Sequence, residues 1–172
     1  MDKKSLETAF NKELVPHGFK KKASSWYRQV NGMLQVVDLQ KSNYGLQFFL
    51  NLCCVPKGMN VDGMPTPKEH KCPIRIRLTA AYSEQRVQIE EALDLERTAL
   101  DDPIRQEALT RITNELVLPF CNNMNSLDML RRAVELGLFK RGAVNGAAQS
   151  HLSLSESNVA PPPDSQPSTY YG

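Results

Sequence analysis

The sequence predicts an α+β fold in which a four-stranded antiparallel meander sheet has an N-terminal helix and about three C-terminal helices covering one face. Two observations predict it. Residues 18–55 contain runs of β-branched and aromatic residues in which apolar and polar side chains alternate, as in half-buried strands. From residue 83 onward the apolar residues recur every three or four positions, which is the period of a helix.

The first predicted element is an amphipathic helix over residues 3–15, in which Leu6, Phe10 and Leu14 share one side. A β-hairpin over residues 25–30 and 33–40 follows. Asn31-Gly32 separates its two strands and suits the positive φ angles of a type I′ turn. A two-residue loop fixes the register, so Trp26 is expected opposite Val37 on the core face of the sheet.

Two further strands are predicted over residues 46–55 and 74–79. The proline-rich residues 56–73 between them are expected to form an irregular loop. Three helices complete the domain. The first covers residues 83–100, and the last runs from its N-cap Ser126 to Gly137. The middle helix has Asp102 as its N-cap and Pro103 as its first residue, and Pro119 bends or ends it.

We expect residues 1–142 to form a single domain and residues 143–172 to form a disordered tail. The tail is rich in Ser, Pro and Ala and has few large apolar side chains to offset the entropy of ordering it. The composition, 41% hydrophobic and 23% charged, is that of a soluble globular protein. No apolar run approaches the roughly 18 residues of a membrane span. Four cysteines without metal-binding spacing, and the lack of a signal peptide, predict a cytoplasmic protein with reduced thiols.

Four blocks of the sequence stand out, in this order: GFKKKASSWYRQ, QVVDLQKSNYGLQFFLNL, CPIRIRL and LPFCNNMNSLDMLRR. Together they resemble the domain of unknown function 4304 family. The resemblance extends from about Leu6 to Phe139 and leaves the tail outside. It implies a small α+β domain, mostly bacterial, with no established activity, cofactor or catalytic residue.

The sheet face opposite the predicted core gathers the residues best suited to hold a ligand. Two strand arginines could clamp a carboxylate or phosphate, because a guanidinium donates a planar fork of hydrogen bonds. The candidate ligand-binding residues on this face and its rim are Tyr27, Asp38, Gln40, Lys41, Ser42, Tyr44, Asn51, Arg75 and Arg77. The alternative is a plain solvated face on which Asp38 pairs with Arg75 or Arg77 across the strands.

The sequence contains no GxSxG, P-loop, GxGxxG or HExxH motif, and its three histidines form no metal-binding pattern. We therefore predict no cofactor, no metal and no catalytic residue. The leading hypothesis is a non-enzymatic binding module for a protein or a small anionic ligand, of which an accessory or toxin-neutralising role is one form.

Two alternatives remain open. One is an enzyme that acts on a small anionic substrate, with Asp38 as its base. The other is weak nucleic-acid binding, with Tyr27 or Tyr44 stacking on bases, through the basic residues Lys20–Lys22, Arg28, Arg75 and Arg77. A net charge of +2 falls well short of the basic bias typical of nucleic-acid binders. The sequence predicts no partner on a membrane and does not specify an oligomeric state.

Overall fold

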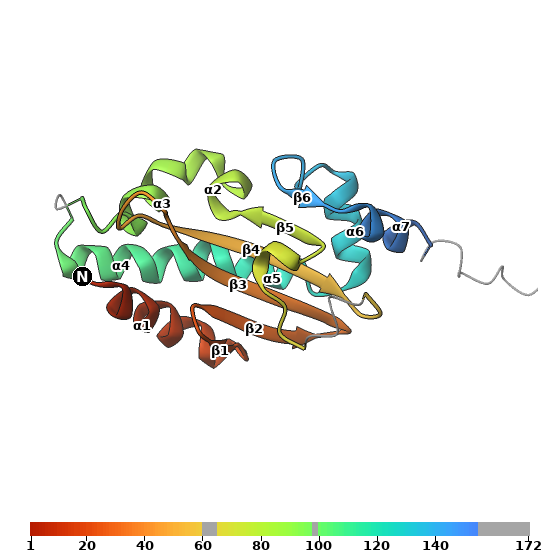
Figure 1. Cartoon of the computed structure of the whole chain (residues 1–172), viewed down its shortest axis with the longest axis horizontal. Coiled ribbons are helices and arrows are strands. Elements are labelled where there is room, and N and C mark those ends of the chain that lie inside the picture. The colour runs from red at the N-terminus through yellow and green to blue at the C-terminus, as the bar shows by residue number, and fades with distance from the viewer. Residues whose placement is uncertain (60–64, 98–99, 155–172) are drawn as a thin grey trace, which may run out of the picture.

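The computed structural model describes residues 1–59, 65–97 and 100–154. Its centre is an antiparallel meander sheet with the strand order β1-β2-β3-β4-β5-β6 (Figure 1). The strands are β1 (Lys20–Lys22), β2 (Ser25–Val30), β3 (Met33–Lys41), β4 (Phe48–Pro56), β5 (Ile74–Arg77) and β6 (Ala143–Val144). The predicted α+β class and antiparallel sheet are confirmed, but the number of strands is wrong: the sheet has six strands, because β1 and β6 extend the predicted four at the two edges.

The helices lie mainly on one side of the sheet. Figure 1 views the opposite side, so that α4 runs behind the strands. The helices are α1 (Lys3–Leu14), α2 (Leu78–Ala81), α3 (Arg86–Leu93), α4 (Asp102–Ile112), α5 (Leu118–Asn123), α6 (Leu127–Glu135) and α7 (Gly146–Leu154). Short 3₁₀ turns cover Val15–His17, Glu69–Lys71 and Ser83–Gln85. None of the helices in these described ranges is long and apolar enough to cross a membrane.

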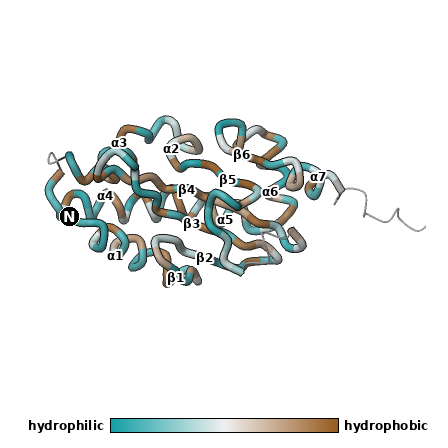
Figure 2. Tube along the Cα trace, viewed as in Figure 1, coloured by the Kyte–Doolittle hydropathy of each residue, from teal (hydrophilic) through white to brown (hydrophobic). Residues whose placement is uncertain are grey.

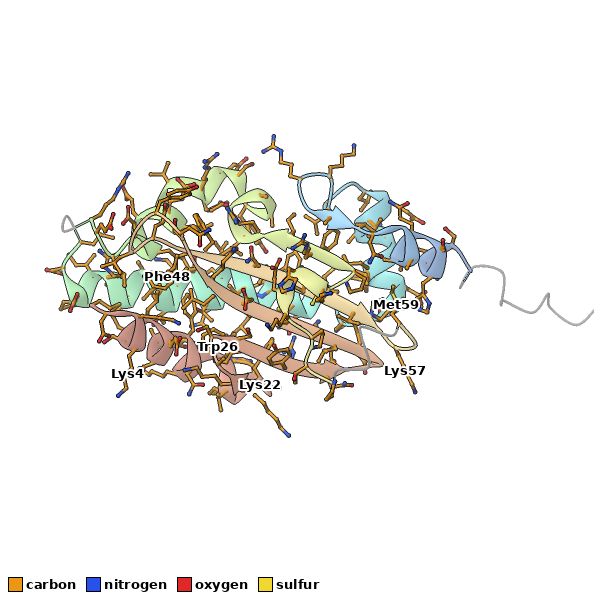
Figure 3. The ribbon with its side chains drawn as sticks, in the orientation of Figure 1. Lys4, Lys22, Trp26, Phe48, Lys57 and Met59 are labelled. Carbon is orange, nitrogen blue, oxygen red and sulfur yellow. The ribbon has the colours of Figure 1, made fainter. Side chains whose placement is uncertain are left out.

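The register of the hairpin determines the core. Trp26 pairs with Val37, Val37 with Leu52, and Leu52 with Ile76, so one row of side chains crosses four strands. All four are at most 2% exposed, which confirms the predicted core face. Figure 3 shows Trp26 within the body of the protein, and Figure 2 shows hydrophobic segments along β4 and β5 at its centre. The Nε1–H group of Trp26 donates a hydrogen bond to Oδ1 of Asn11 at 3.3 Å, which ties α1 to the sheet.

The long helical stretch after residue 101 departs from the prediction at both ends. Asp101, not Asp102, is the N-cap: its carboxylate accepts a hydrogen bond from the backbone N–H of Ile104 at 3.0 Å. Pro119 does not end the helix. A π-helical turn over Thr113–Val117 precedes it, and α5 continues beyond. Proline lacks a backbone N–H and its ring crowds the carbonyl four residues earlier, and widening the preceding turn relieves that conflict.

The end of one predicted strand and the end of one predicted helix also differ from the prediction. The strand predicted over residues 74–79 stops at Arg77, since α2 begins with Leu78. The helix predicted over residues 83–100 ends at Leu93. The next residue, Asp94, forms an isolated β-bridge with Gln47 instead.

The chain continues in regular structure past residue 142, where the sequence places the domain boundary. Ala143–Val144 pair with β5, and α7 follows with Ala148 fully buried and Leu152 5% exposed in the main core. The side-chain amide of Asn145 caps α7 by accepting a hydrogen bond from the backbone N–H of Ala148 at 2.8 Å. The apolar residues that dock are small or widely spaced, so they give little periodic signal in a Ser/Ala-rich segment. The remainder of the predicted tail, residues 155–172, lies outside the described residues.

A buried arginine joins α3 to α4. Arg105 is 3% exposed, and its guanidinium donates hydrogen bonds to backbone carbonyl oxygens at the end of α3 and just beyond it. The acceptors are the carbonyls of Glu91 at 2.9 Å, Ala92 at 3.0 Å, Asp94 at 2.8 Å and Arg97 at 2.6 Å. A positive charge at a helix C-terminus also interacts favourably with the helix dipole. Arg105 therefore fixes the chain where α3 ends.

Replacing Arg105 by methionine, which preserves most of the volume, is expected to lower the free energy of unfolding by about 3 kcal/mol, since buried carbonyl groups lose their donors. Urea denaturation followed by circular dichroism measures this change. The control is Arg111→Met, on an exposed position of the same helix, for which a change within about 0.5 kcal/mol is expected. Equal losses in the two variants would contradict the structural role of Arg105.

Candidate functional site

The face of the sheet opposite the main helix layer, here called the outer face, carries a row of polar residues. Ser25 pairs with Asp38, Asp38 with Asn51, and Asn51 with Arg77. This row lies one pleat away from the buried row of Trp26, because successive side chains of a strand point to opposite faces. The hairpin register thus places most of the predicted site residues on one face, as the sequence predicts.

The outer face is not a plain solvated surface. Part of the chain between β4 and β5 covers the middle of it and forms a second, smaller hydrophobic cluster. Its buried members are Leu34, Val36, Cys53, Val55 and Cys72, with Tyr27 and Met59 packed against them. The hydroxyl of Tyr27 donates a hydrogen bond to the carbonyl of Pro67 at 3.2 Å. Tyr27 is therefore engaged in packing this loop, on the other side of the cluster from Arg75.

Asp38 does not pair with either arginine. Its carboxylate accepts a hydrogen bond from the hydroxyl of Ser25 at 2.6 Å. Asn51 stands between Asp38 and Arg77 in the sheet, so the backbones of these two residues are about 10 Å apart at a strand spacing near 4.8 Å. Asp38 therefore makes its hydrogen bond with Ser25, and the ion pair with Arg75 or Arg77 that the solvated-face alternative predicts is not formed.

Arg75 and Arg77 line a polar hollow of about 360 Å³, here called the Arg75 hollow. Arg75 forms an ion pair with Glu69 at 3.1 Å. The amide oxygen of Gln40 accepts hydrogen bonds from Nδ2 of Asn51 at 3.0 Å and from Nη2 of Arg77 at 3.4 Å, so Gln40 orients both side chains. The residues that line this hollow are Gln40, Asn51, Glu69, His70, Arg75, Ile76, Arg77, Gly142 and Ala143.

Arg77 also lines a second hollow, of about 580 Å³, here called the Arg86 hollow. Its guanidinium lies over the ring of Phe49, 4.1 Å from the centroid. Stacking on an aromatic face holds the guanidinium plane while leaving its edge free to donate hydrogen bonds. The residues that line this hollow are Gln47, Phe49, Arg77, Thr79, Ala80, Ser83, Arg86, Glu90 and Arg141.

The predicted rim residues Lys41, Ser42 and Tyr44 line neither hollow. Their loop is fastened to the segment after α3: the backbone N–H of Leu46 donates to the carboxylate of Glu96 at 3.0 Å. Tyr44 is 96% exposed at the tip of this loop. The structure therefore brings Gln40, Asn51, Arg75 and Arg77 from the predicted set together at the Arg75 hollow, whereas Tyr27, Asp38 and the rim residues do not line it.

Several lining residues were not predicted from the sequence. Phe49 could have been found, because it alternates with Asn51 on β4 and so shares its face. Glu69 and His70 lie in the short 3₁₀ turn between β4 and β5, and Arg86 and Arg141 come from α3 and from the connection between α6 and β6. No local periodicity connects these segments to the sheet, so only the folded chain shows that they meet.

The basic residues proposed for nucleic-acid binding do not form one surface. Arg28 lies on the inner face, where its Nε–H group donates to Gln35 at 2.9 Å and its guanidinium lies over Phe19. Lys21 forms an ion pair with Glu7 at 2.7 Å. Lys20 and Lys22 line a separate hollow of about 600 Å³ beside Tyr27. Figure 3 shows Lys22 projecting at the margin of the protein.

All four cysteine thiols are buried, Cys53 and Cys72 under the outer face and Cys54 and Cys121 in the main core. The hydrogen bond with Cys72 and the loss of hydration raise the pKa of Cys53 well above its ordinary value of 9.0. Burial likewise raises the pKa of Cys54, and it raises that of Cys121 to about 12. A thiol is a poor nucleophile unless it ionises, so Cys53, Cys54 and Cys121 do not support thiolate chemistry at neutral pH. No group of three or more His, Cys, Asp or Glu residues within the described ranges is placed to hold a metal ion.

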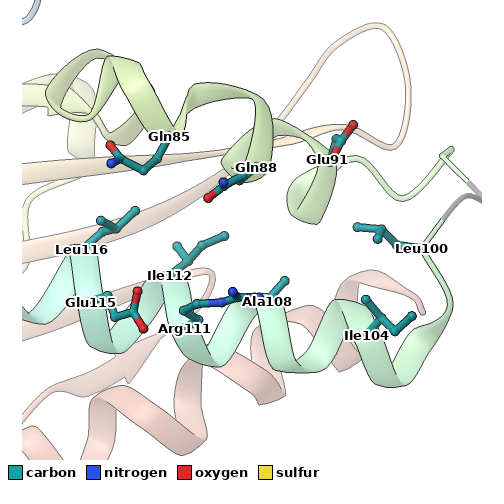
Figure 4. A pocket seen from close by; sticks show the side chains of 10 residues that line it. All are labelled: Gln85, Gln88, Glu91, Leu100, Ile104, Ala108, Arg111, Ile112, Glu115 and Leu116. Carbon is teal, nitrogen blue, oxygen red and sulfur yellow. The ribbon is translucent and has the colours of Figure 1, made fainter.

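A fourth hollow, of about 260 Å³, lies between α3 and α4 on the helical side (Figure 4). Leu100, Ile104 and Ile112 give it an apolar floor, and Gln88, Glu91 and Arg111 are among its polar lining residues. It shares no residue with the outer face. Its lining mixes both signs of charge, with Glu91 and Glu115 beside Arg111.

A family model described as "Domain of unknown function (DUF4304)" matches residues 10–123. The chain therefore belongs to the domain of unknown function 4304 family, as its sequence blocks indicate. The comparisons with curated proteins and with solved structures found no match. The matched span runs from α1 to the end of α5. It includes Arg75, Arg77 and Arg86, but not the segment that supplies Arg141, Gly142 and Ala143 to the hollows.

The raised pKa of Cys53 gives a testable pH dependence. Above about pH 9 the unfolded chain loses the Cys53 proton while the folded chain keeps it, so the folded state loses stability as the pH rises, by about 1.4 kcal/mol per pH unit for this one group. In Cys53→Ala, the plot of the free energy of unfolding against pH is expected to be shallower by that slope above pH 9. Denaturation measured from pH 7 to pH 11 tests it. Parallel plots for the two proteins would show that Cys53 ionises equally in both states.

Proposed function

We propose that this protein is a non-enzymatic binding module that holds an anionic group on the outer face of its sheet, at Arg77. The observation that supports the proposal is the environment of the Arg77 guanidinium. It is exposed, stacked on Phe49, oriented by Gln40, and not within ion-pair distance of any carboxylate in the described residues. It stands where two hollows meet.

The surroundings of Arg77 favour an anion. A guanidinium held in place loses less conformational entropy when it binds than a free surface arginine does. The neighbouring Asn51 is 5% exposed and presents an amide to the same hollow. Arg75 adds a second guanidinium whose charge Glu69 already balances. These groups can form several charge-assisted hydrogen bonds to one carboxylate or phosphate.

A binding role is favoured over catalysis because the charged side chains that line the hollows either donate hydrogen bonds or take part in ion pairs. Asp38, the proposed base, hydrogen-bonds Ser25 and lies two strands away from Arg77, and the thiol of Cys53 on this face is buried and neutral. As part of the same proposal we place the protein in a reducing, cytoplasmic compartment, since all four cysteines are free thiols. An accessory role in which a partner protein supplies the anionic group is a form of this proposal.

Titration of the ¹⁵N-labelled protein with butyrate and with inorganic phosphate, each at constant ionic strength, tests the proposal. We expect saturable shifts of the side-chain N–H signals of Arg77, Asn51 and Gln40. Arg77→Gln is expected to weaken binding at least about tenfold, because one charge-assisted contact is lost. Arg77→Lys keeps the charge but loses the planar fork and is expected to bind at an intermediate level.

The matched control is Arg111→Gln, which makes the same change of charge on the helical side and is expected to leave both affinities unchanged. Because Arg77 is exposed, the urea denaturation of Arg77→Gln should match that of the unmodified protein. Shifts that do not saturate, or equal affinities for the unmodified protein and Arg77→Gln, would refute binding at this site.

A further inference from the structure

The two hollows of the outer face form one continuous cationic feature. Arg77 lines both of them, and the consecutive residues Arg141, Gly142 and Ala143 also divide between the two linings. Arg77 and the segment 141–143 therefore form the boundary from which both hollows are reached. A ligand that engages Arg77 can extend to either side of it.

The charges of the two hollows do not cancel. Arg75 pairs with Glu69 at 3.1 Å, and Arg86 pairs with Glu90 at 2.7 Å. Arg77 and Arg141 also line the hollows, and neither lies within ion-pair distance of a carboxylate among the described residues. Four arginines thus face two glutamates, which leaves two positive charges in excess.

A glycine allows the segment 141–143 to approach β5. A Cβ atom at Gly142 would lie 2.3 Å from the carbonyl oxygen of Arg75 and 3.0 Å from Cβ of Ile76. Any larger residue would therefore force this segment away from the strand that carries Arg75 and Arg77. The hydrogen bond from the backbone N–H of Gly142 to the carbonyl of Phe139, at 2.9 Å, holds the turn in this position. The close packing of Gly142 against β5 therefore positions the neighbouring Arg141 beside the Arg86 hollow.

We infer that the ligand of the proposed binding module is a small dicarboxylate, with one carboxylate in each hollow; this inference rests on the proposed function. Arg75, Arg77 and Asn51 receive the first carboxylate. Arg86 and Arg141, with the hydroxyls of Thr79 and Ser83, receive the second. Two carboxylates match the two excess positive charges, whereas two phosphate groups would bring three to four negative charges.

The experiment compares the affinity of butyrate with the affinities of dicarboxylates from succinate to suberate, at constant ionic strength. Every dicarboxylate in this series carries the same charge at neutral pH, so a dependence on chain length reports the distance between two subsites. We expect one chain length to bind at least about tenfold more tightly than butyrate, the gain of one added charge-assisted contact. Arg141→Gln is expected to reduce that affinity to the level of butyrate while leaving butyrate binding unchanged.

Arg111→Gln again provides the charge-matched control, and it is expected to change neither affinity. Dicarboxylates that all bind no better than butyrate would overturn the inference, as would an Arg141→Gln variant that retains the gain or weakens butyrate equally. In each of these cases the saturable, Arg77-dependent binding of butyrate would leave the proposed function standing. Absence of any Arg77-dependent binding would overturn both.

Discussion

The pairing of β2 with β3 through the turn at Asn31-Gly32 is the constraint on which the other layers depend. Both residues have positive φ, 45° for Asn31 and 76° for Gly32, so the turn closes with two residues and admits a single register. A shift by one residue would move Trp26 to the outer face and Asp38 into the core. Because the meander continues by nearest-neighbour pairing, the same register sets the positions of Asn51 on β4 and Arg77 on β5.

Two buried polar side chains then position the helices, one from the sheet and one from α4. Gln35, 1% exposed on the inner face, donates hydrogen bonds to the carbonyls of Cys121 at 2.6 Å and Met124 at 2.8 Å. Arg105 does the same for the end of α3. In both cases a side chain donates to carbonyls in or just beyond the last turn of a helix, where intrahelical donors run out. These contacts are specific in a way that apolar packing is not, because a misplaced helix would leave buried polar groups unpaired.

Most of what could be predicted from the sequence came from the alternation of apolar and polar side chains along the strands and from the residue types in the turns. They predicted the hairpin, its register, the core face and the placement of Gln40, Asn51, Arg75 and Arg77 on the other face. They could not show that Glu69 neutralises Arg75, because loop residues have no period that links them to a strand. They also missed β6 and α7, whose few docking residues, such as Ala148, produce no regular pattern. The hydrogen bond between Ser25 and Asp38 was not predicted, because strand order alone does not say which of several neighbours on a face makes the contact.

The two edges of the meander have a further consequence for the behaviour of the protein in solution. At one edge, β1 consists of three lysines, all exposed; at the other, β6 is only two residues long and leads directly into α7. An open strand edge is a template for another chain, and a second copy pairing at β1 would bring like charges together. The sheet is thus terminated on both sides against edge-to-edge aggregation. Both edges therefore disfavour pairing with a second copy of the chain.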